Sequence, residues 1–307
     1  MYVTIFQVQK QEFVARITER LYNMTENKST HKKTGFSFEV FPPKKDEEFE
    51  NAYQVMQGLG RLNPDFISCT YGAGGSRASK TIEIASFIQK ELHINAIAHI
   101  TCVGFTKEDL QRNCDALREA GINHVLALRG DRPQTMTDEQ YDNREFYYAT
   151  DLVHYLNEHT DLQIAGACYP EKHFESPNFE EDLRHLKEKV DAGVSSLISQ
   201  MFFNNDFFYR FLDKVHAMGI DVPVHAGIMP ITSSKQLGTS VTLSGSSIPK
   251  KLADIIAKYG DDKEDMRRAG VDYAIQQILD LKEHGTDGIH IYTMNRVKTT
   301  SEIMAQI

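Results

Sequence analysis

The segment that decides the fold is AIAHITCV, residues 96–103. It is a short apolar run, and the amphipathic stretch Lys107–Ala120 follows it. The pattern repeats on both sides, because FISCTY (66–71) precedes this run and HVLALRG (124–130) follows it. Short apolar runs bounded by turns are typical of strands buried on both faces, as in a parallel sheet.

The same alternation extends over most of the chain. The five further apolar runs are FSFEVF (36–41), QIAGACY (163–169), SLISQMFF (196–203), VPVHAGI (222–228) and GIHIYTM (288–294). Helical patterns between the runs include Glu47–Leu59, Ser79–Leu92, Asn178–Ala192, Asp206–Ala217 and Asp265–Glu283. Eight alternating units are the number that closes a barrel, so the sequence predicts an α/β fold, a (β/α)8 or TIM barrel, as one domain over residues 1–307. A doubly wound open sheet is the alternative.

Two segments fall outside the repeat. Residues 1–34 are predicted to form an N-terminal extension with a helix over Gln11–Met24, and residues 232–262 a helical excursion between strands seven and eight. Thr106 and Ser79 each precede a helical pattern and are predicted N-cap residues.

Composition excludes several classes of protein. The chain has 34 Lys and Arg against 43 Asp and Glu, a net charge of −9, which argues against nucleic-acid binding. No stretch approaches the roughly 18 apolar residues of a membrane span. The four cysteines form no CxxC pair and the histidines no HxH or HExxH pattern, so neither a disulfide framework nor a metal site is expected. A cytoplasmic location follows as an expectation.

Polar residues stand near the ends of the predicted strands. Glu39, Thr70, His99 and Arg129 are 31, 29 and 30 residues apart, about one βα unit each. Tyr169, Gln200 and Tyr292 hold the corresponding places in later strands. Barrel enzymes carry their active sites at the C-terminal ends of the strands, so these side chains predict a ligand site.

Glu39 is the most informative carboxylate, because it lies between Phe38 and Val40. Desolvation in such surroundings raises a carboxyl pKa towards that of a general acid. The alternative is a Glu paired with a core Arg or Lys.

The Arg129-Gly130-Asp131 turn follows the fourth strand. Gly130 permits close approach of a ligand, Arg129 suits a phosphate, and Asp131 can accept hydrogen bonds from an amino-pyrimidine edge. A local Arg–Asp pair is the alternative. The GAGGS turn at 72–76 is a weaker phosphate signal, since it matches neither GxGxxG nor a Walker A motif.

Seven motifs together carry a family resemblance. They are FSFEVFPPK (36–44), FISCTYGAGGS (66–76), HITCVG (99–104), LALRGDRP (126–133), YPEKH (169–173), KVDAGVSSLISQMFF (189–203) and HIYTMNR (290–296). In this combination and order the chain resembles methylenetetrahydrofolate reductase of the bacterial type, the catalytic barrel alone. The resemblance implies non-covalent FAD, reduction by NADH or NADPH, and conversion of 5,10-methylenetetrahydrofolate to 5-methyltetrahydrofolate for methionine biosynthesis. It also implies a homo-oligomer.

The resemblance assigns roles to individual residues. Glu39 would be the acid that protonates folate N10, Asp131 would contact the pterin near the flavin, and Gln200 would bind folate. Further folate contacts would come from Gln236, Tyr292 and Arg296. The residues expected to hold the flavin are Thr70, His99, Arg129, Gly130, Asp131, Ala167, Tyr169, His173, Asp182 and Lys189.

One departure from the family concerns the reductant. Family members can stack the dinucleotide adenine on an aromatic residue just after the Gln236 position, where this chain has Leu237, Gly238, Thr239 and Ser240. The choice between NADH, NADPH and a protein electron donor therefore stays open. Two other functions remain as alternatives: a flavin-free one-carbon enzyme such as a methyltransferase, and a non-enzymatic folate- or flavin-binding protein.

Overall fold

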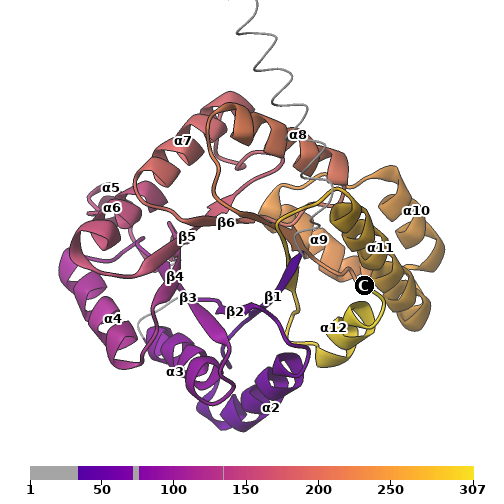
Figure 1. The fold of residues 1–307 in the computed structure, drawn as a ribbon, viewed down its shortest axis with the longest axis horizontal. Coiled ribbons are helices and arrows are strands. Elements are labelled where there is room, and N and C mark those ends of the chain that lie inside the picture. The colour runs from indigo at the N-terminus through magenta and orange to yellow at the C-terminus, as the bar shows by residue number, and fades with distance from the viewer. Residues whose placement is uncertain (1–33, 72–75, 134) are drawn as a thin grey trace, which may run out of the picture. The chain divides into compact units, whose positions relative to one another are not determined.

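The eight strands form a closed parallel barrel in the order β1-β2-β3-β4-β5-β6-β7-β8 (Figure 1). The computed structural model describes residues 34–71, 76–133 and 135–307. The strands are β1 Gly35–Val40, β2 Phe66–Cys69, β3 Asn95–Thr101, β4 His124–Leu128, β5 Gln163–Cys168, β6 Ser196–Ser199, β7 Val224–Ile228 and β8 Gly288–Tyr292. All eight predicted strands and the predicted barrel are confirmed, and the open-sheet alternative is wrong.

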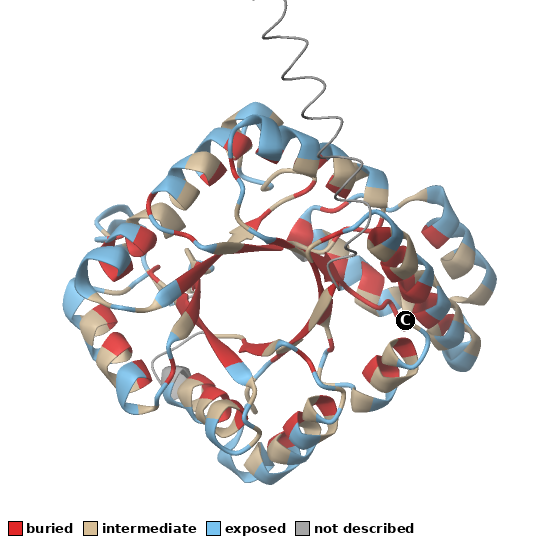
Figure 2. Cartoon of the chain, in the orientation of Figure 1, coloured by how far each residue is buried: buried red, intermediate tan, exposed pale blue. Residues whose placement is uncertain are grey.

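Helices surround the barrel and pack their apolar faces on it. In the described ranges they are α2 Phe49–Gly60, α3 Ser76–Lys90, α4 Lys107–Glu119, α5 Asp138–Asp142, α6 Ala149–His159, α7 Phe179–Asp191, α8 Asn205–Ala217, α9 Ser234–Ser244, α10 Lys250–Tyr259, α11 Lys263–Glu283 and α12 Val297–Met304, with a short 3-10 helix at Asp46–Glu48. Figure 2 shows buried residues on the helix faces turned towards the strands and exposed residues on the outside.

Local signals account for most helix starts. The Thr106 side chain accepts a hydrogen bond from the backbone N–H of Asp109, as the predicted cap requires. Ser79 lies inside α3, so its prediction as an N-cap is wrong. The helical excursion is confirmed, since α9 and α10 fall between β7 and β8. The helix predicted over Gln11–Met24 and most of the GAGGS turn lie outside the described residues.

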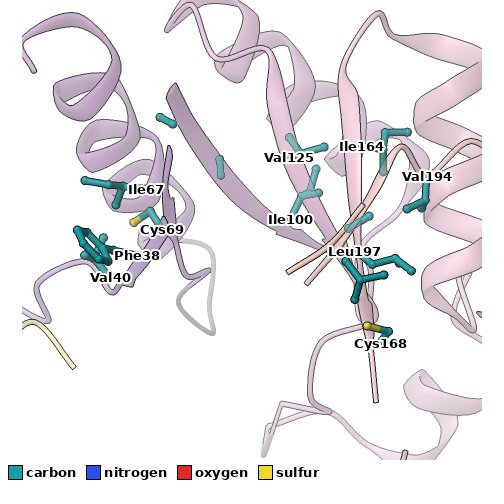
Figure 3. Close-up of a cluster of buried hydrophobic side chains, with 14 of the residues drawn as sticks. Phe38, Val40, Ile67, Cys69, Ile100, Val125, Ile164, Cys168, Val194 and Leu197 are labelled. Carbon is teal, nitrogen blue, oxygen red and sulfur yellow. The ribbon is translucent and has the colours of Figure 1, made fainter. Parts of the chain in front are cut away.

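Residues that alternate along the strands form two hydrophobic cores, one between the strands and the helices and one inside the barrel. Outward-pointing residues such as Ile100, Val125, Ile164 and Leu197 are buried between strands and helices (Figure 3). Inward-pointing residues form a second cluster of Ile97, Leu126, Ala165 and Ile198. The inner cluster fills the barrel, so side chains further along the same strands are raised towards the C-terminal mouth.

Two expectations from composition can be set against the structure. All four cysteines are free and buried. Among the helices of residues 34–71, 76–133 and 135–307, none combines the length and apolar character that crossing a membrane requires.

Candidate functional site

A cavity of about 1420 Å³ occupies the C-terminal mouth of the barrel. It exceeds the roughly 300–1,000 Å³ of a typical small-molecule pocket, so it has room for more than one ligand. Eleven of the predicted site residues line it: Glu39, Thr70, His99, Arg129, Gly130, Asp131, Ala167, Tyr169, His173, Gln200 and Tyr292. The structure thus brings together side chains from β1 to β6 and from β8.

Glu39 stands beside a buried histidine in this cavity. Its Oε2 is 3.6 Å from Nε2 of His99, and the Glu39 side chain is 21 % exposed. Burial raises the pKa of Glu39, and the nearby His99 offsets part of that rise. Burial also lowers the pKa of His99 to about 4, although Glu39 acts in the opposite direction. Burial therefore acts against charge on both groups of the pair.

No Arg or Lys forms an ion pair with Glu39 among the residues described. The partners within ion-pair distance of its carboxylate are His99 and His290, the latter at 3.9 Å. The alternative prediction of a core Arg or Lys partner is therefore not met in this part of the chain.

His290 lies beneath Glu39 and was not among the predicted residues. It is fully buried, its Nδ1 is 2.8 Å from Ser37 Oγ, and its Nε2 is 3.4 Å from Ser68 Oγ. Burial lowers the pKa of His290 to about 3, so the imidazole is neutral. The signal was present in the sequence, because His290 and Tyr292 alternate along one strand and so share a face.

Strands β6 and β7 pair over only a short stretch beside the cavity. Their pairing is limited to Leu197↔Val224 and Ile198↔His225. Beyond it, the backbone N–H of Gly227 donates to Ser199 Oγ at 2.9 Å, and the Tyr292 hydroxyl donates to the Ser199 carbonyl at 2.7 Å. A Cβ at Gly227 would lie 2.2 Å from that carbonyl oxygen and 2.8 Å from the Tyr292 ring, so no side chain fits there.

Arg129 provides positive charge on the opposite wall. Its two Nη atoms donate to the two carboxylate oxygens of Glu175. This bond holds the pKa of Glu175 below its usual range and raises that of Arg129. Gly130 follows with φ +84°, and a Cβ there would lie 2.9 Å from Thr101 Cβ. The guanidinium therefore already binds an anion, whereas the space that Gly130 leaves is occupied by the Thr101 and Val103 side chains.

Asp182 and Lys189 lie behind the wall rather than in its lining. Lys189 Nζ donates to the carbonyl of Ala167, a lining residue, and burial lowers the pKa of this ammonium. Asp182 accepts a hydrogen bond of 2.6 Å from Ser176 Oγ. Both groups support the β5–α7 segment that carries Tyr169 and His173.

Two predicted folate contacts, Gln236 and Arg296, do not line the cavity. Gln236 Oε1 accepts from the backbone N–H and the hydroxyl of Thr232, and its Nε2 donates to the Pro230 carbonyl. Arg296 Nη1 donates to the same Thr232 hydroxyl. Both side chains are therefore bound by hydrogen bonds to the segment between β7 and α9.

In the ranges 34–71, 76–133 and 135–307, no three His, Cys, Asp or Glu side chains form a group able to hold a metal ion.

A family model described as methylenetetrahydrofolate reductase matches residues 24–307. The chain belongs to the methylenetetrahydrofolate reductase family. A 5,10-methylenetetrahydrofolate reductase of Pectobacterium carotovorum subsp. carotovorum is 34 % identical over 267 residues, covering 87 % of this chain and 88 % of that one. The methylenetetrahydrofolate reductase (NADH) 1 of Arabidopsis thaliana is 31 % identical, over 95 % of this chain and 50 % of the plant protein.

Solved structures support the fold of this family member. A Clostridium thermocellum protein that binds two copies of 5-methyl-5,6,7,8-tetrahydrofolic acid aligns with a TM-score of 0.58 and 17 % identity, over 90 % of this chain and 95 % of that one. A dihydropteroate synthase from Xanthomonas albilineans aligns with a TM-score of 0.52 and 14 % identity, over 90 % of this chain and 92 % of the other. At these identities the likeness concerns the barrel alone.

Proposed function

We propose that this enzyme reduces 5,10-methylenetetrahydrofolate to 5-methyltetrahydrofolate with NADH or NADPH through bound FAD. The observation that carries the proposal is the meeting of Glu39, Asp131 and Gln200 in one cavity of a chain that belongs to the methylenetetrahydrofolate reductase family. The product is a methyl donor for methionine biosynthesis. A cytoplasmic homo-oligomer is the expected form.

The cavity fits a flavin dinucleotide by its volume and its polar groups. Arg129 already binds a carboxylate, which suits it to a pyrophosphate. Two buried polar atoms that face this region, His99 Nε2 and Tyr71 Oη, have no hydrogen-bond partner within the described chain. Such atoms require partners, which a polar heterocycle can supply.

The residues that would hold FAD are those expected from the sequence. Thr70, His99, Gly130, Asp131 and Tyr169 line the cavity. Arg129 would face the phosphates, with His173 on the same side. Ala167, Asp182 and Lys189 would shape the wall behind them. When bound, FAD supplies the two-electron redox chemistry that couples the nicotinamide to the folate.

Glu39 supplies the proton that the folate requires. The five-membered ring of methylenetetrahydrofolate opens when N10 is protonated, which leaves an N5 iminium able to accept hydride. A carboxyl group whose pKa is raised by burial holds its proton to a higher pH than a solvated carboxyl group does, and it can donate that proton to N10. His99, neutral and adjacent, does not compete for that proton because its own pKa is lowered.

The remaining residues orient the folate. Asp131 is exposed at the mouth, where its carboxylate can accept hydrogen bonds from the amino-pyrimidine edge of the pterin. Gln200 follows β6, and its Oε1 accepts from the backbone N–H of Met201, which fixes the amide orientation. Tyr292 closes this side of the cavity through its bond to Ser199.

The test begins with the purified protein, which we expect to be yellow and to bleach on anaerobic addition of NADH or NADPH. Methylenetetrahydrofolate should then restore the flavin absorbance, with 5-methyltetrahydrofolate as the product. Colourless protein that FAD does not reconstitute would contradict the proposal and favour a flavin-free one-carbon enzyme. Size-exclusion chromatography tests the expected homo-oligomer.

A further inference from the structure

One exposed aromatic ring faces the cavity. Among the described residues, the large apolar side chains that are exposed are Phe41, Tyr147, Tyr148, Phe174, Met218, Ile248 and Met294. Of these, Phe174 lines the cavity, and it is 59 % exposed. A single exposed apolar residue is ordinary on a surface, so the significance of Phe174 depends on its surroundings.

One face of the Phe174 ring packs against a neighbouring histidine ring. The ring stacks on His173, with centroids 4.6 Å apart and planes at 26°. His173 in turn meets the Tyr169 ring edge-on at 4.7 Å. Burial lowers the pKa of His173, so an uncharged imidazole lies under the phenyl ring. Phe174 is thus held in place while much of its surface stays open.

The position next to Phe174 is a site for negative charge. Glu175 follows it directly and places its carboxylate on Arg129, in the wall of the cavity. A ligand whose phosphate replaced that carboxylate would bring the adjoining part of the molecule near Phe174. In a nucleotide, a ribose joins the phosphate to a planar base, so a nucleotide would bring such a base to this part of the cavity.

Among the described residues that line the cavity, no other large aromatic side chain is exposed. Thr242 and Ser244 of α9 also line the cavity. Gly245 ends this helix, and a Cβ on Gly245 would lie 3.5 Å from Phe174 Cβ. The other rings of the cavity wall, such as Tyr169 and Tyr292, are packed into it and less exposed. Phe174 is therefore the ring best placed to receive a planar group at this end.

We propose that Phe174 is a stacking platform for the adenine of a bound dinucleotide. This inference rests on the proposed function, and both FAD and the nicotinamide reductant carry an adenine. A base stacked on an aromatic side chain typically contributes roughly 5- to 150-fold in affinity. The platform thus determines specificity for dinucleotides over mononucleotides.

The test compares each dinucleotide with its mononucleotide, which lacks the adenine. Apoprotein is titrated with FAD and with FMN by flavin fluorescence. Flavin-loaded protein is reduced under anaerobic conditions by the preferred nicotinamide dinucleotide and by reduced nicotinamide mononucleotide. Phe174→Ala removes the ring, Phe174→Leu keeps apolar bulk without an aromatic face, and Phe174→Tyr keeps the face. Met218→Ala, an exposed apolar truncation outside the cavity lining, is the matched control.

We expect Phe174→Ala to weaken one dinucleotide at least 5-fold and to leave the matching mononucleotide unchanged. Loss of FAD affinity with FMN unaffected would assign the platform to the flavin. A raised KM for the reductant, with flavin titration unchanged, would assign it to the nicotinamide dinucleotide. Phe174→Leu should resemble Phe174→Ala, whereas Phe174→Tyr and Met218→Ala should behave as the wild type.

The proposal is overturned if Phe174→Ala keeps both dinucleotide affinities within 2-fold, or if dinucleotide and mononucleotide weaken together. Restoration by Phe174→Leu would also overturn it, because the role would then be apolar contact. Wild-type protein that binds neither flavin nor dinucleotide would remove the proposed function as well. A wild-type flavoenzyme with an unaffected Phe174→Ala variant removes the platform alone.

Discussion

Nε2 of His99 lies 3.6 Å from Oε2 of Glu39, and this nitrogen has no hydrogen-bond partner within the described chain. Both groups are poorly hydrated, and burial acts on each pKa so as to remove its charge. A raised carboxyl pKa in the wall of a cavity favours retention of a proton for transfer to a substrate.

Glu39→Gln is expected to separate the two half-reactions. Reduction of the flavin by NADH or NADPH should stay within about 2-fold of the wild type, because it needs no acid. The folate half-reaction should slow by roughly 10²- to 10⁴-fold, the usual contribution of a general acid. Anaerobic stopped-flow absorbance measures both rates. Glu47→Gln, an exposed carboxylate outside the cavity, is the control, and an unimpaired folate step in Glu39→Gln would refute the assignment.

Arg129→Gln is expected to weaken FAD binding. Hydrogen bonds to charged groups typically contribute about 1.5–3 kcal/mol, so the dissociation constant should rise by roughly 10- to 150-fold. Fluorescence titration of the apoprotein with FAD gives the value. Arg118→Gln removes a surface guanidinium that pairs with Asp115 and should leave the affinity unchanged. Equal affinities in Arg129→Gln and wild type would place the phosphates elsewhere.

Acid is expected to destabilise the fold through His290. Its folded-state pKa of about 3 lies below the ordinary value near 6.5, so the unfolded chain binds the extra proton between these limits. The free energy of unfolding attributable to His290 is therefore fully present above about pH 6.5 and is lost towards pH 3, at up to about 1.4 kcal/mol per pH unit. His99 acts in the same direction down to about pH 4.

Urea unfolding of wild type and His290→Asn at pH 7, 6 and 5 measures this effect. The variant should have a smaller dependence of its unfolding free energy on pH, while His216→Asn, an exposed histidine of α8, should match the wild type. Glu39 contributes with the opposite sign, since its pKa is raised, but it is common to all three proteins. Parallel pH profiles for wild type and His290→Asn would contradict the burial of a neutral imidazole.

Substitution by alanine should change the free energy of unfolding in opposite directions at two helical glycines. A Cβ on Gly270 of α11 would lie 1.6 Å from the Ile231 carbonyl oxygen, whereas one on Gly238 of α9 would meet nothing within 4 Å. Gly238→Ala should raise the free energy of unfolding by about 0.5–1 kcal/mol through helix propensity. Gly270→Ala should lower it by at least about 1 kcal/mol, because backbone must move. Chemical denaturation decides, and a stabilised Gly270→Ala would show that α11 does not approach this carbonyl so closely.

The sequence was sufficient for the strands because each is largely buried and reads as a short, predominantly apolar run bounded by turns. One helix that packs on the barrel was missed. Helix α6, Ala149–His159, was not among the predicted helical patterns, and its N-cap Tyr148 offers no side-chain cap hydrogen bond. Periodicity thus identified the strands better than the helices that cover them.

The candidate site was predictable where a polar side chain ends a strand, as for Glu39, His99 and Gln200, since barrel geometry alone then brings the residues together. Gln236 and Arg296 lie in the excursion and in the turn after β8, where tertiary contacts decide the direction of the side chain. In the structure both bind Thr232. The position of Phe174 in the cavity wall could not be predicted either, because the exposure of a ring cannot be deduced from its neighbours in the chain.

The Tyr292 hydroxyl of β8 is bonded to the Ser199 carbonyl at the end of β6, beyond the last paired residues of β6 and β7. Ser199 thus joins three neighbouring strands at the rim, because its carbonyl accepts from the Tyr292 hydroxyl of β8 and its own hydroxyl accepts from the Gly227 N–H of β7. Gly227, which has no room for a side chain, restricts how far the inherited sequence can vary there.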